Sequence, residues 1–175
     1  MSPQERHEVV LQLLDRHGRS LHRLLARLTR CEQATADLMQ DLFIRLSQAD
    51  GAAYARNLYA YAWKSAVNLA FDWRRRQRTN VCPLEEDEHF DESATPVLGR
   101  MIREEQIERV LEATSELDEP GRSVVIMRYI EQQSYEQIAL QLGKNPNYLR
   151  ALCSKALAQL RDTCCEKDDR RMNHG

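Results

Sequence analysis

The sequence predicts an all-α protein, built as two small helical domains joined by an acidic linker. Apolar residues recur at intervals of three and four through most of the 175 residues, which is the period of an amphipathic helix. No segment shows the alternation typical of a strand, and there is no internal repeat. The stretch "TNVCPLEEDEHFDESATP" interrupts the helical pattern with two prolines and with six acids in residues 85 to 92, which indicates a linker.

Composition indicates a folded, soluble chain. Hydrophobic residues make up 42% and charged residues 30%, unlike a disordered segment. No window approaches 18 consecutive apolar residues, and the start "MSPQERHEVV" lacks the apolar core of a secretory signal. We therefore expect a cytoplasmic protein without membrane insertion.

The net charge of -2 conceals an uneven distribution along the chain. Residues 1 to 79 carry +5, residues 80 to 119 carry -10 and residues 120 to 175 carry +3. Two basic ends therefore flank an acidic middle, a pattern that suits two modules facing a polyanion.

The first predicted helix covers residues 4 to 30. We expect Gly18 to divide it in two, because glycine is a weak helix former. Its apolar side comprises Val10, Leu13, Leu14, His17, Leu21, Leu24, Leu25 and Leu28.

The second predicted helix covers residues 35 to 46 and has two contrasting sides. The apolar side holds Leu38, Met39, Leu42, Phe43 and Leu46. The opposite side holds the polar residues Asp37, Gln40, Asp41 and Arg45. A loop, "SQADGAAYARN", follows.

The third predicted helix covers residues 58 to 77. A polar stripe at steps of three and four contains Tyr61, Lys64, Asn68, Asp72 and Arg75 or Arg76. The residues expected to face the core are Leu58, Ala62, Ala66, Leu69, Ala70 and Trp73. Trp63 lies on the border of the two sides, so it could either stack on an unpaired base or support the helix.

Helical periodicity resumes near residue 98 and persists to about residue 161, with breaks at 118–121, 132–133 and 143–145. Ser134 and Gln137 have the spacing of a capping box, and Gly143 can supply a left-handed helix stop. Asn145 and Pro146 are typical of the start of another helix. Two helices joined by so short a turn form a helix-turn-helix.

The second helix of this motif predicts a surface for duplex DNA. Its buried side comprises Leu149, Leu152, Cys153, Ala156, Leu157 and Leu160. Its exposed side comprises Asn147, Tyr148, Arg150, Ala151, Ser154 and Lys155, a set that can donate to bases and phosphates in a major groove. By itself the motif also fits an ordinary antiparallel helix pair with polar outer residues.

Metal and catalytic sites are not expected. The five cysteines, Cys31, Cys82, Cys153, Cys164 and Cys165, include no C-x-x-C pair and no histidine at a zinc-ligand spacing. We expect reduced thiols, with a metal or redox role at Cys164 and Cys165 as the alternative. The five histidines have no motif-like partner, so we predict no catalytic residue, no cofactor and no enzyme.

Three segments resemble, in order, the extracytoplasmic-function sigma factors of the bacterial sigma-70 family. "ATADLMQDLFIRL" is similar to the D-L-x-Q-[DE]-x-F motif of their domain two, and "LYAYAWKSAVNLAFDWRRRQR" to its A-[WY]-L-x-x-I-A-x-N-x-x-x-D-x-x-R-R-x-x-R motif. "LDEPGRSVVIMRYIEQQSYEQIALQLGKNPNYLRALCSKALAQL" resembles domain four, in which L-[PD]-x-x-x-R-x-x-x-x-L-R precedes the helix-turn-helix. The matches cover about three quarters of the chain.

The resemblance implies a promoter-specificity subunit with two partners, core RNA polymerase and promoter DNA. It implies polymerase docking by Asp37, Gln40 and Asp41. It implies binding of the opened minus-ten strand, with help from the loop 49–57, by Tyr61, Trp63, Lys64, Asn68, Arg74, Arg75, Arg76 and Arg78. It implies recognition of the minus-thirty-five duplex by Asn147, Tyr148, Arg150, Ala151, Ser154 and Lys155. Members are commonly held by an anti-sigma factor, which the sequence does not identify.

The expected organisation is domain two at 1–79, a linker at 80–103 that would follow the RNA-exit path, domain four at 104–163, and a polar tail at 164–175. Tyr148 stands where the family usually has threonine, and Pro146-Asn147 replaces a small, glycine-containing entry. Ser65 stands where isoleucine is usual, and Asp118 where proline is frequent. The rival functions are a stand-alone helix-turn-helix regulator that binds duplex DNA as a dimer, and a helical adaptor that binds only protein.

Overall fold

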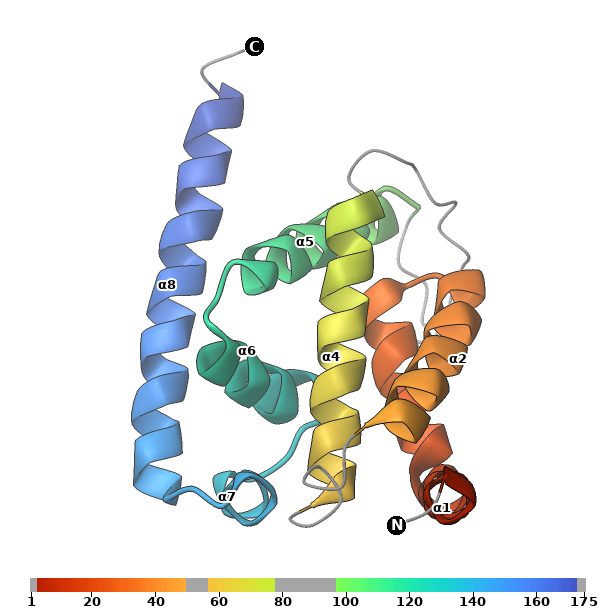
Figure 1. Ribbon diagram of the computed structural model, residues 1–175. Helices are drawn as coiled ribbons and strands as arrows, with labels where there is room; N and C mark the ends of the chain where they lie inside the picture. The colour runs from red at the N-terminus through yellow and green to blue at the C-terminus, as the bar shows by residue number, and fades with distance from the viewer. Residues whose placement is uncertain (1–2, 50–56, 78–96, 173–175) are drawn as a thin grey trace. The chain divides into compact units, whose positions relative to one another are not determined.

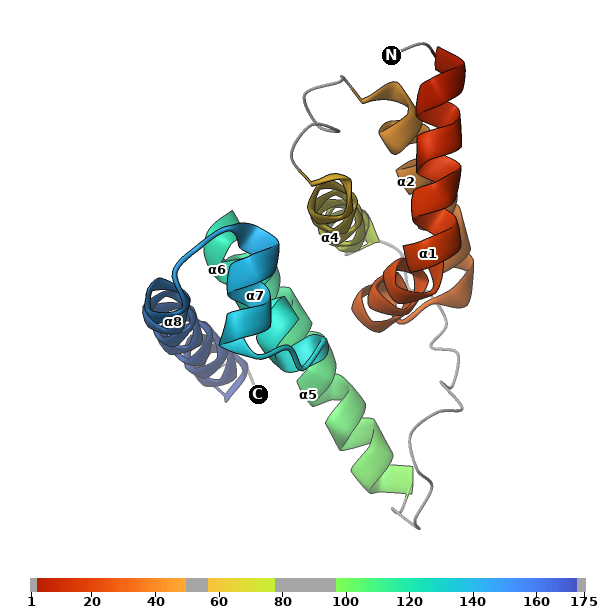
Figure 2. The same cartoon turned by 90° about the horizontal axis from the view of Figure 1, so that it is seen from below.

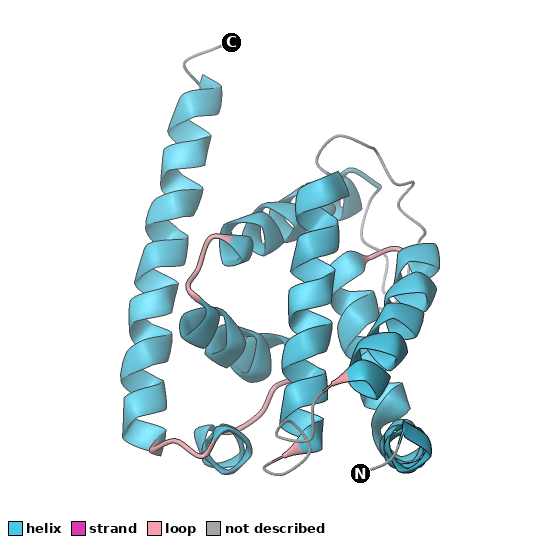
Figure 3. Ribbon diagram, viewed as in Figure 1, coloured by secondary structure: helices cyan, strands magenta, loops and turns pink. Residues whose placement is uncertain are grey.

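The computed structural model describes residues 3–49, 57–77 and 97–172. The chain divides into two compact units, Met1–Asp87 and Glu88–Gly175, and each is described by itself. Every regular element in the described ranges is helical, and none is a strand (Figure 3). The prediction of an all-α protein is therefore confirmed.

The first unit contains α1 (Pro3–Thr29), α2 (Glu32–Gln48) and α4 (Leu58–Gln77), which pack against one another (Figure 1). The bounds of α4 match the predicted helix. Six of the eight apolar-side residues predicted for α1 are buried, and Leu14 and His17 are half-buried. The largest fully buried side chains of this unit are Leu21, Leu25, Leu28, Leu42, Leu46, Trp63 and Phe71.

The prediction that Gly18 divides α1 is wrong, because the helix runs without interruption through that residue. Figure 2 shows α1 bending along its length without ending. Glycine costs a helix interior about 1 kcal/mol, whereas each buried leucine in α1 contributes more than that. Packing of the apolar side therefore outweighs the local preference.

The end of α1 is held by side chains from the rest of the unit. Arg30 adopts a left-handed conformation with φ 53°, which stops the helix. The Arg74 Nη1 donates a hydrogen bond to the Leu28 carbonyl over 3.0 Å, so α4 satisfies one of the carbonyls left open at the end of α1. The hydroxyl oxygens of Thr29 and Thr35 lie 2.8 Å apart across the turn into α2.

The second unit contains α5 (Val97–Ser115), α6 (Glu119–Val125), a π-helical turn η1 (Ile126–Ile130), α7 (Tyr135–Leu142) and α8 (Pro146–Met172). Two expected boundaries differ from these. Helix α5 begins inside the predicted linker 80–103, of which residues 80–96 lie outside the described residues. Helix α8 continues through most of the predicted polar tail, to Met172.

Helix α6 supports α8 through a close approach at Gly121. The Asp118 carboxylate caps α6 by accepting a hydrogen bond from the Gly121 N–H over 3.0 Å. A Cβ at Gly121 would lie 2.6 Å from that carboxylate oxygen and 3.3 Å from the Ala156 Cβ of α8. The buried core of this unit includes Val124, Ile126, Met127, Ile138, Leu149, Cys153 and Ala156.

Candidate nucleic-acid interface

The helix-turn-helix forms as predicted, from local hydrogen bonds. The Gln137 N–H donates to the Ser134 hydroxyl over 3.2 Å, and the Ser134 N–H donates to the Gln137 side-chain oxygen over 2.8 Å. Gly143 ends α7 in the left-handed conformation at φ 63°. The Asn145 side chain accepts from the Asn147 N–H over 2.8 Å, at the start of α8. The predicted capping box, the end of α7 at Gly143 and the start of α8 at Asn145 are all confirmed.

The first turns of α8 present one buried and one exposed side. Leu149, Cys153, Ala156 and Leu160 are buried, while Leu152 and Leu157 are half-buried. All six residues predicted to contact duplex DNA are exposed: Asn147, Tyr148, Arg150, Ala151, Ser154 and Lys155. The side chains that can reach a groove therefore share one surface of the helix.

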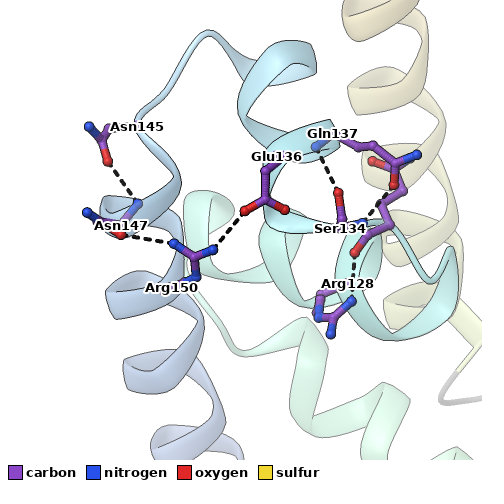
Figure 4. Close-up of polar contacts among 8 residues, drawn as sticks. Arg128, Ser134, Glu136, Gln137, Asn145, Asn147 and Arg150 are labelled. Atoms are coloured by element: carbon purple, nitrogen blue, oxygen red, sulfur yellow. Dashed lines mark hydrogen bonds and ion pairs between the residues drawn. The ribbon is translucent and has the colours of Figure 1, made fainter.

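Arg150 makes polar contacts with both helices of the motif (Figure 4). Its Nη2 lies 2.7 Å from the Glu136 Oε1 of α7, and its Nη1 donates to the Asn147 Oδ1 over 2.9 Å. Its Cζ lies 5.3 Å from the centre of the Tyr135 ring. The guanidinium is therefore held from both helices while 48% of the side chain remains exposed.

Tyr135 and Glu136 at the start of α7 have shifted ionisation. A hydrogen bond with the Cys153 thiol, and secondarily burial, raises the pKa of Tyr135, so the phenol stays neutral. Hydrogen bonds from its own backbone N–H, from Ser134 and from Arg150 lower the pKa of Glu136, so its carboxylate stays charged to more acidic pH. Arg128 also lies over the Tyr135 ring, at 5.2 Å, and donates to the Gln133 carbonyl over 2.9 Å.

Helix α4 exposes part of its predicted polar stripe and leaves the rest half-buried. Lys64, Arg75 and Arg76 are exposed, and Tyr61, Asn68 and Asp72 are half-buried. Ala62, Ala66, Leu69 and Ala70 are buried as predicted, whereas Leu58 and Trp73 are only half-buried.

Trp63 lies in the core of the first unit and is 1% exposed. Helix α4 packs against both α1 and α2, so its buried arc is broad and also includes Ser65, Val67 and Phe71. Of the two roles that the sequence left open, support of the helix fits this position. Stacking on a base does not fit, because the indole offers almost no accessible face.

The consecutive arginines at the end of α4 make different contacts. Arg74 bonds the Leu28 carbonyl, as described above. Arg75 forms an ion pair with Asp72, and the Arg76 Nε donates to the Asp72 carbonyl over 3.3 Å. Arg78 lies outside the described residues.

Helix α2 exposes Asp37, Gln40 and Asp41, with Asp37 accepting a hydrogen bond from the Gln33 amide over 3.2 Å. Asp41 also lines an open groove whose walls come from α2 and α4. The other lining residues are Ile44, Arg45, Gln48, Ala49, Tyr61, Leu69 and Arg76. Sequence reasoning missed Ile44, which is 51% exposed. Ile44 follows Asp41 by three residues, so it lies on the polar side of α2. An apolar residue on that side was the signal in the sequence.

The described cysteines are free thiols. Cys31 and Cys153 are buried, Cys164 is half-buried and Cys165 is exposed, while Cys82 lies outside the described residues. Within the described ranges, no group of three or more histidine, cysteine or acidic side chains is placed to hold a metal ion. A search of the same ranges for helices long and apolar enough to cross a membrane found none.

Comparison with known proteins follows the division into two units. Residues 13–79 match the model of Sigma-70 region 2, and residues 107–160 match that of Sigma-70, region 4. The chain is 29% identical to the RNA polymerase sigma-E factor of Streptomyces avermitilis over 135 residues, covering 75% of this chain and 72% of the relative. It is 27% identical to the ECF RNA polymerase sigma factor SigE of Mycolicibacterium smegmatis over 153 residues, covering 86% of this chain and 60% of the relative.

A solved structure of the sigma factor RpoE with the anti-sigma factor NepR from Bartonella quintana is also similar, with 18% identity and a TM-score of 0.45. The match covers 87% of this chain and 94% of that chain. The two region models together match well over half of the residues, each on the unit whose helices carry the corresponding motifs. The chain belongs to the sigma-70 family, as a sigma factor of the extracytoplasmic-function type.

Proposed function

We propose that this chain binds core RNA polymerase, recognises a two-part promoter and helps to open it, with no covalent chemistry of its own. The observation that carries the proposal is the exposed side of α8. Six residues suited to DNA contact gather there, while Leu149, Cys153 and Ala156 turn inward. A helix with that division can enter a major groove with its first turns.

Duplex recognition at minus-thirty-five is assigned to this surface of the second unit. Arg150 and Asn147 carry side chains that pair with guanine and adenine edges. Lys155 adds a charge that can meet a phosphate. We expect Lys155→Ala to weaken duplex binding by about 1 kcal/mol, and equal binding at fixed salt would remove Lys155 from the interface.

The minus-ten strand is assigned to the polar stripe of α4. Tyr61 offers an aromatic ring and Lys64, Arg75 and Arg76 offer charges, which is the combination that holds unpaired nucleic acid. We assign Arg74 to this surface as well. Its hydrogen bond to the Leu28 carbonyl gives it a second role, in the structure of the first unit. Trp63 is assigned to the core that supports α4.

Polymerase docking is assigned to the exposed residues Asp37, Gln40 and Asp41 of α2. Asp41→Arg should weaken association with core polymerase, because it inverts a charge on that surface without touching the buried side of α2. Co-purification with core polymerase measures this, with far-ultraviolet circular dichroism as the check on helicity. Undiminished co-purification of the variant would remove Asp41 from the docking surface.

The domain roles follow: residues 1–79 dock on polymerase and bind the minus-ten strand, 80–103 link, and 104–163 bind the minus-thirty-five duplex. The chain would act in the cytoplasm, where its polymerase and promoter are, and an anti-sigma factor would be a further partner.

The deciding experiment is transcription reconstituted with core polymerase and a library of genomic promoter fragments. A promoter-specificity subunit yields discrete transcript starts that depend on both the chain and the polymerase. A stand-alone dimeric regulator would bind duplex DNA without polymerase and yield no starts. A protein-only adaptor would do neither, and either result would overturn the proposal.

A further inference from the structure

Arg150 is oriented before any DNA arrives. Glu136 of α7 and Asn147 of α8 each bond a different nitrogen of its guanidinium, at 2.7 and 2.9 Å. The Tyr135 ring lies beneath the same group at 5.3 Å. Three groups therefore fix one end of a side chain that otherwise has several rotatable bonds, as Figure 4 shows for the two polar contacts.

Orientation matters differently for two kinds of DNA contact. A phosphate can be met by a positive charge from many directions, and such contacts carry no sequence information directly. A guanine edge is read by a planar fork that must lie in the plane of the base. An arginine held in advance loses less conformational freedom on binding, which favours the geometrically demanding contact.

Glu136 also has a cost for DNA binding. Its side chain is 63% exposed beside the duplex-facing surface, where the carboxylate repels phosphates. An acid with no other role there would weaken binding to every duplex by the same factor. By holding Arg150, however, Glu136 can favour the duplex whose base edge fits the held guanidinium over duplexes that lack that base.

We propose that Glu136 is a positioning residue that makes Arg150 a discriminating contact rather than a sequence-independent charge. The proposal rests on the proposed function, in that the exposed side of α8 must meet duplex DNA. Glu136 acts through Arg150 and is assigned no base of its own.

The test compares two duplexes bound by the full-length chain with core polymerase at one fixed salt concentration. One duplex is selected by the wild-type protein from a random library, and the other is its scrambled counterpart. The measured quantity is the ratio of the two affinities. Glu136→Ala should lower this ratio about two- to fivefold, because binding to the selected duplex falls while binding to the scrambled duplex stays equal or rises. Glu105→Ala removes the same charge from an exposed position of α5 and should leave the ratio unchanged.

A double-mutant cycle separates positioning from support of the fold. Glu136 lies in the first turn of α7, where an acid also stabilises the helix, so a single variant mixes two effects. Arg150→Ala should lower the ratio about fivefold or more, since a bidentate contact with a base edge discriminates against the wrong base. In that background, Glu136→Ala should change the ratio no further. Glu136→Gln keeps an oxygen that can accept from Arg150 and should fall between wild type and Glu136→Ala.

Two results would overturn the inference. One is a Glu136→Ala variant that changes both affinities by the same factor. The other is a variant that lowers the ratio equally with and without Arg150. Failure of the wild-type chain to direct transcription would instead contradict the proposed function, before any variant is compared.

Discussion

The two units hold their arginines in different ways. At the end of α4, Arg75 and Arg76 contact Asp72 of their own helix, and Arg74 reaches a backbone carbonyl of α1. At the start of α8, Arg150 is held by a carboxylate from the neighbouring helix, by an amide from its own helix and by an aromatic ring. The arginines of α4 therefore place positive charges at a helix end, whereas the guanidinium of Arg150 is held in one orientation.

This difference agrees with the two kinds of nucleic acid proposed for the units. An opened strand is held mainly through its phosphates and by stacking, which tolerate many orientations. A duplex read by its base edges requires a defined one. A run of arginines suits the first task, whereas a single arginine with a built support suits the second.

Both tryptophans lie in α4, so tryptophan fluorescence reports the unfolding of the first unit alone. Circular dichroism reports helix loss in both units. Together the two measurements assign a change in stability to one unit, and the following expectations use them in that way.

The largest effect is expected at Trp63. Trp63→Ala should destabilise the first unit by about 3–5 kcal/mol, because it empties a fully buried site between packed helices. The fluorescence of Trp73 should then show a clearly lower unfolding midpoint. Tyr61→Ala, two residues away and half-buried, is the matched control and should change stability much less. An unchanged midpoint with impaired binding of single-stranded DNA would place the Trp63 ring on the strand instead.

The second unit should be most sensitive at Gly121. Gly121→Ala forces a Cβ against the Asp118 cap and against Ala156 of α8, and should cost about 1–3 kcal/mol. The circular dichroism transition should shift while the fluorescence transition does not. A shift in fluorescence alone would contradict this expectation.

Alanine variants of Arg74 and Arg75 should differ in stability but should weaken single-strand binding alike. Arg74→Ala should cost about 1 kcal/mol of first-unit stability, because the Leu28 carbonyl loses its donor. Arg75→Ala lies on the exposed side and should stay within about 0.5 kcal/mol of wild type. Both should reduce the salt slope of single-strand binding by about 0.7, provided each residue meets one phosphate. Equal stabilities of the two variants would contradict the structural duty of Arg74.

The smallest effect is a gain, at Gly18. Gly18→Ala should stabilise the first unit by about 0.5–1 kcal/mol, because alanine restricts the unfolded chain and its Cβ would meet only the Leu14 Cβ at 3.9 Å. A rise in the fluorescence midpoint checks it. A fall would mean that α1 needs glycine at this position.

Local rules in the sequence were sufficient for the helix-turn-helix and for the recognition surface. The capping box at Ser134, the stop at Gly143 and the start at Asn145 all depend on neighbours within a few residues. The exposed side of α8 follows from the helical period alone, so its six residues could be named without a structure. By the same period, Ile44 is an apolar residue on the polar side of α2.

The sequence by itself determined the all-α class, the two units and which side of α8 faces outward, because periodicity and caps are properties of adjacent residues. Only the tertiary structure decided that Trp63 is buried, that α1 continues through Gly18, that Arg74 closes α1 and that Glu136 holds Arg150. Periodicity gives the direction in which a side chain points but not how many helices lie in that direction. The contacts of Arg74 and Arg150 join residues 46 and 14 positions apart, a separation at which local rules specify nothing.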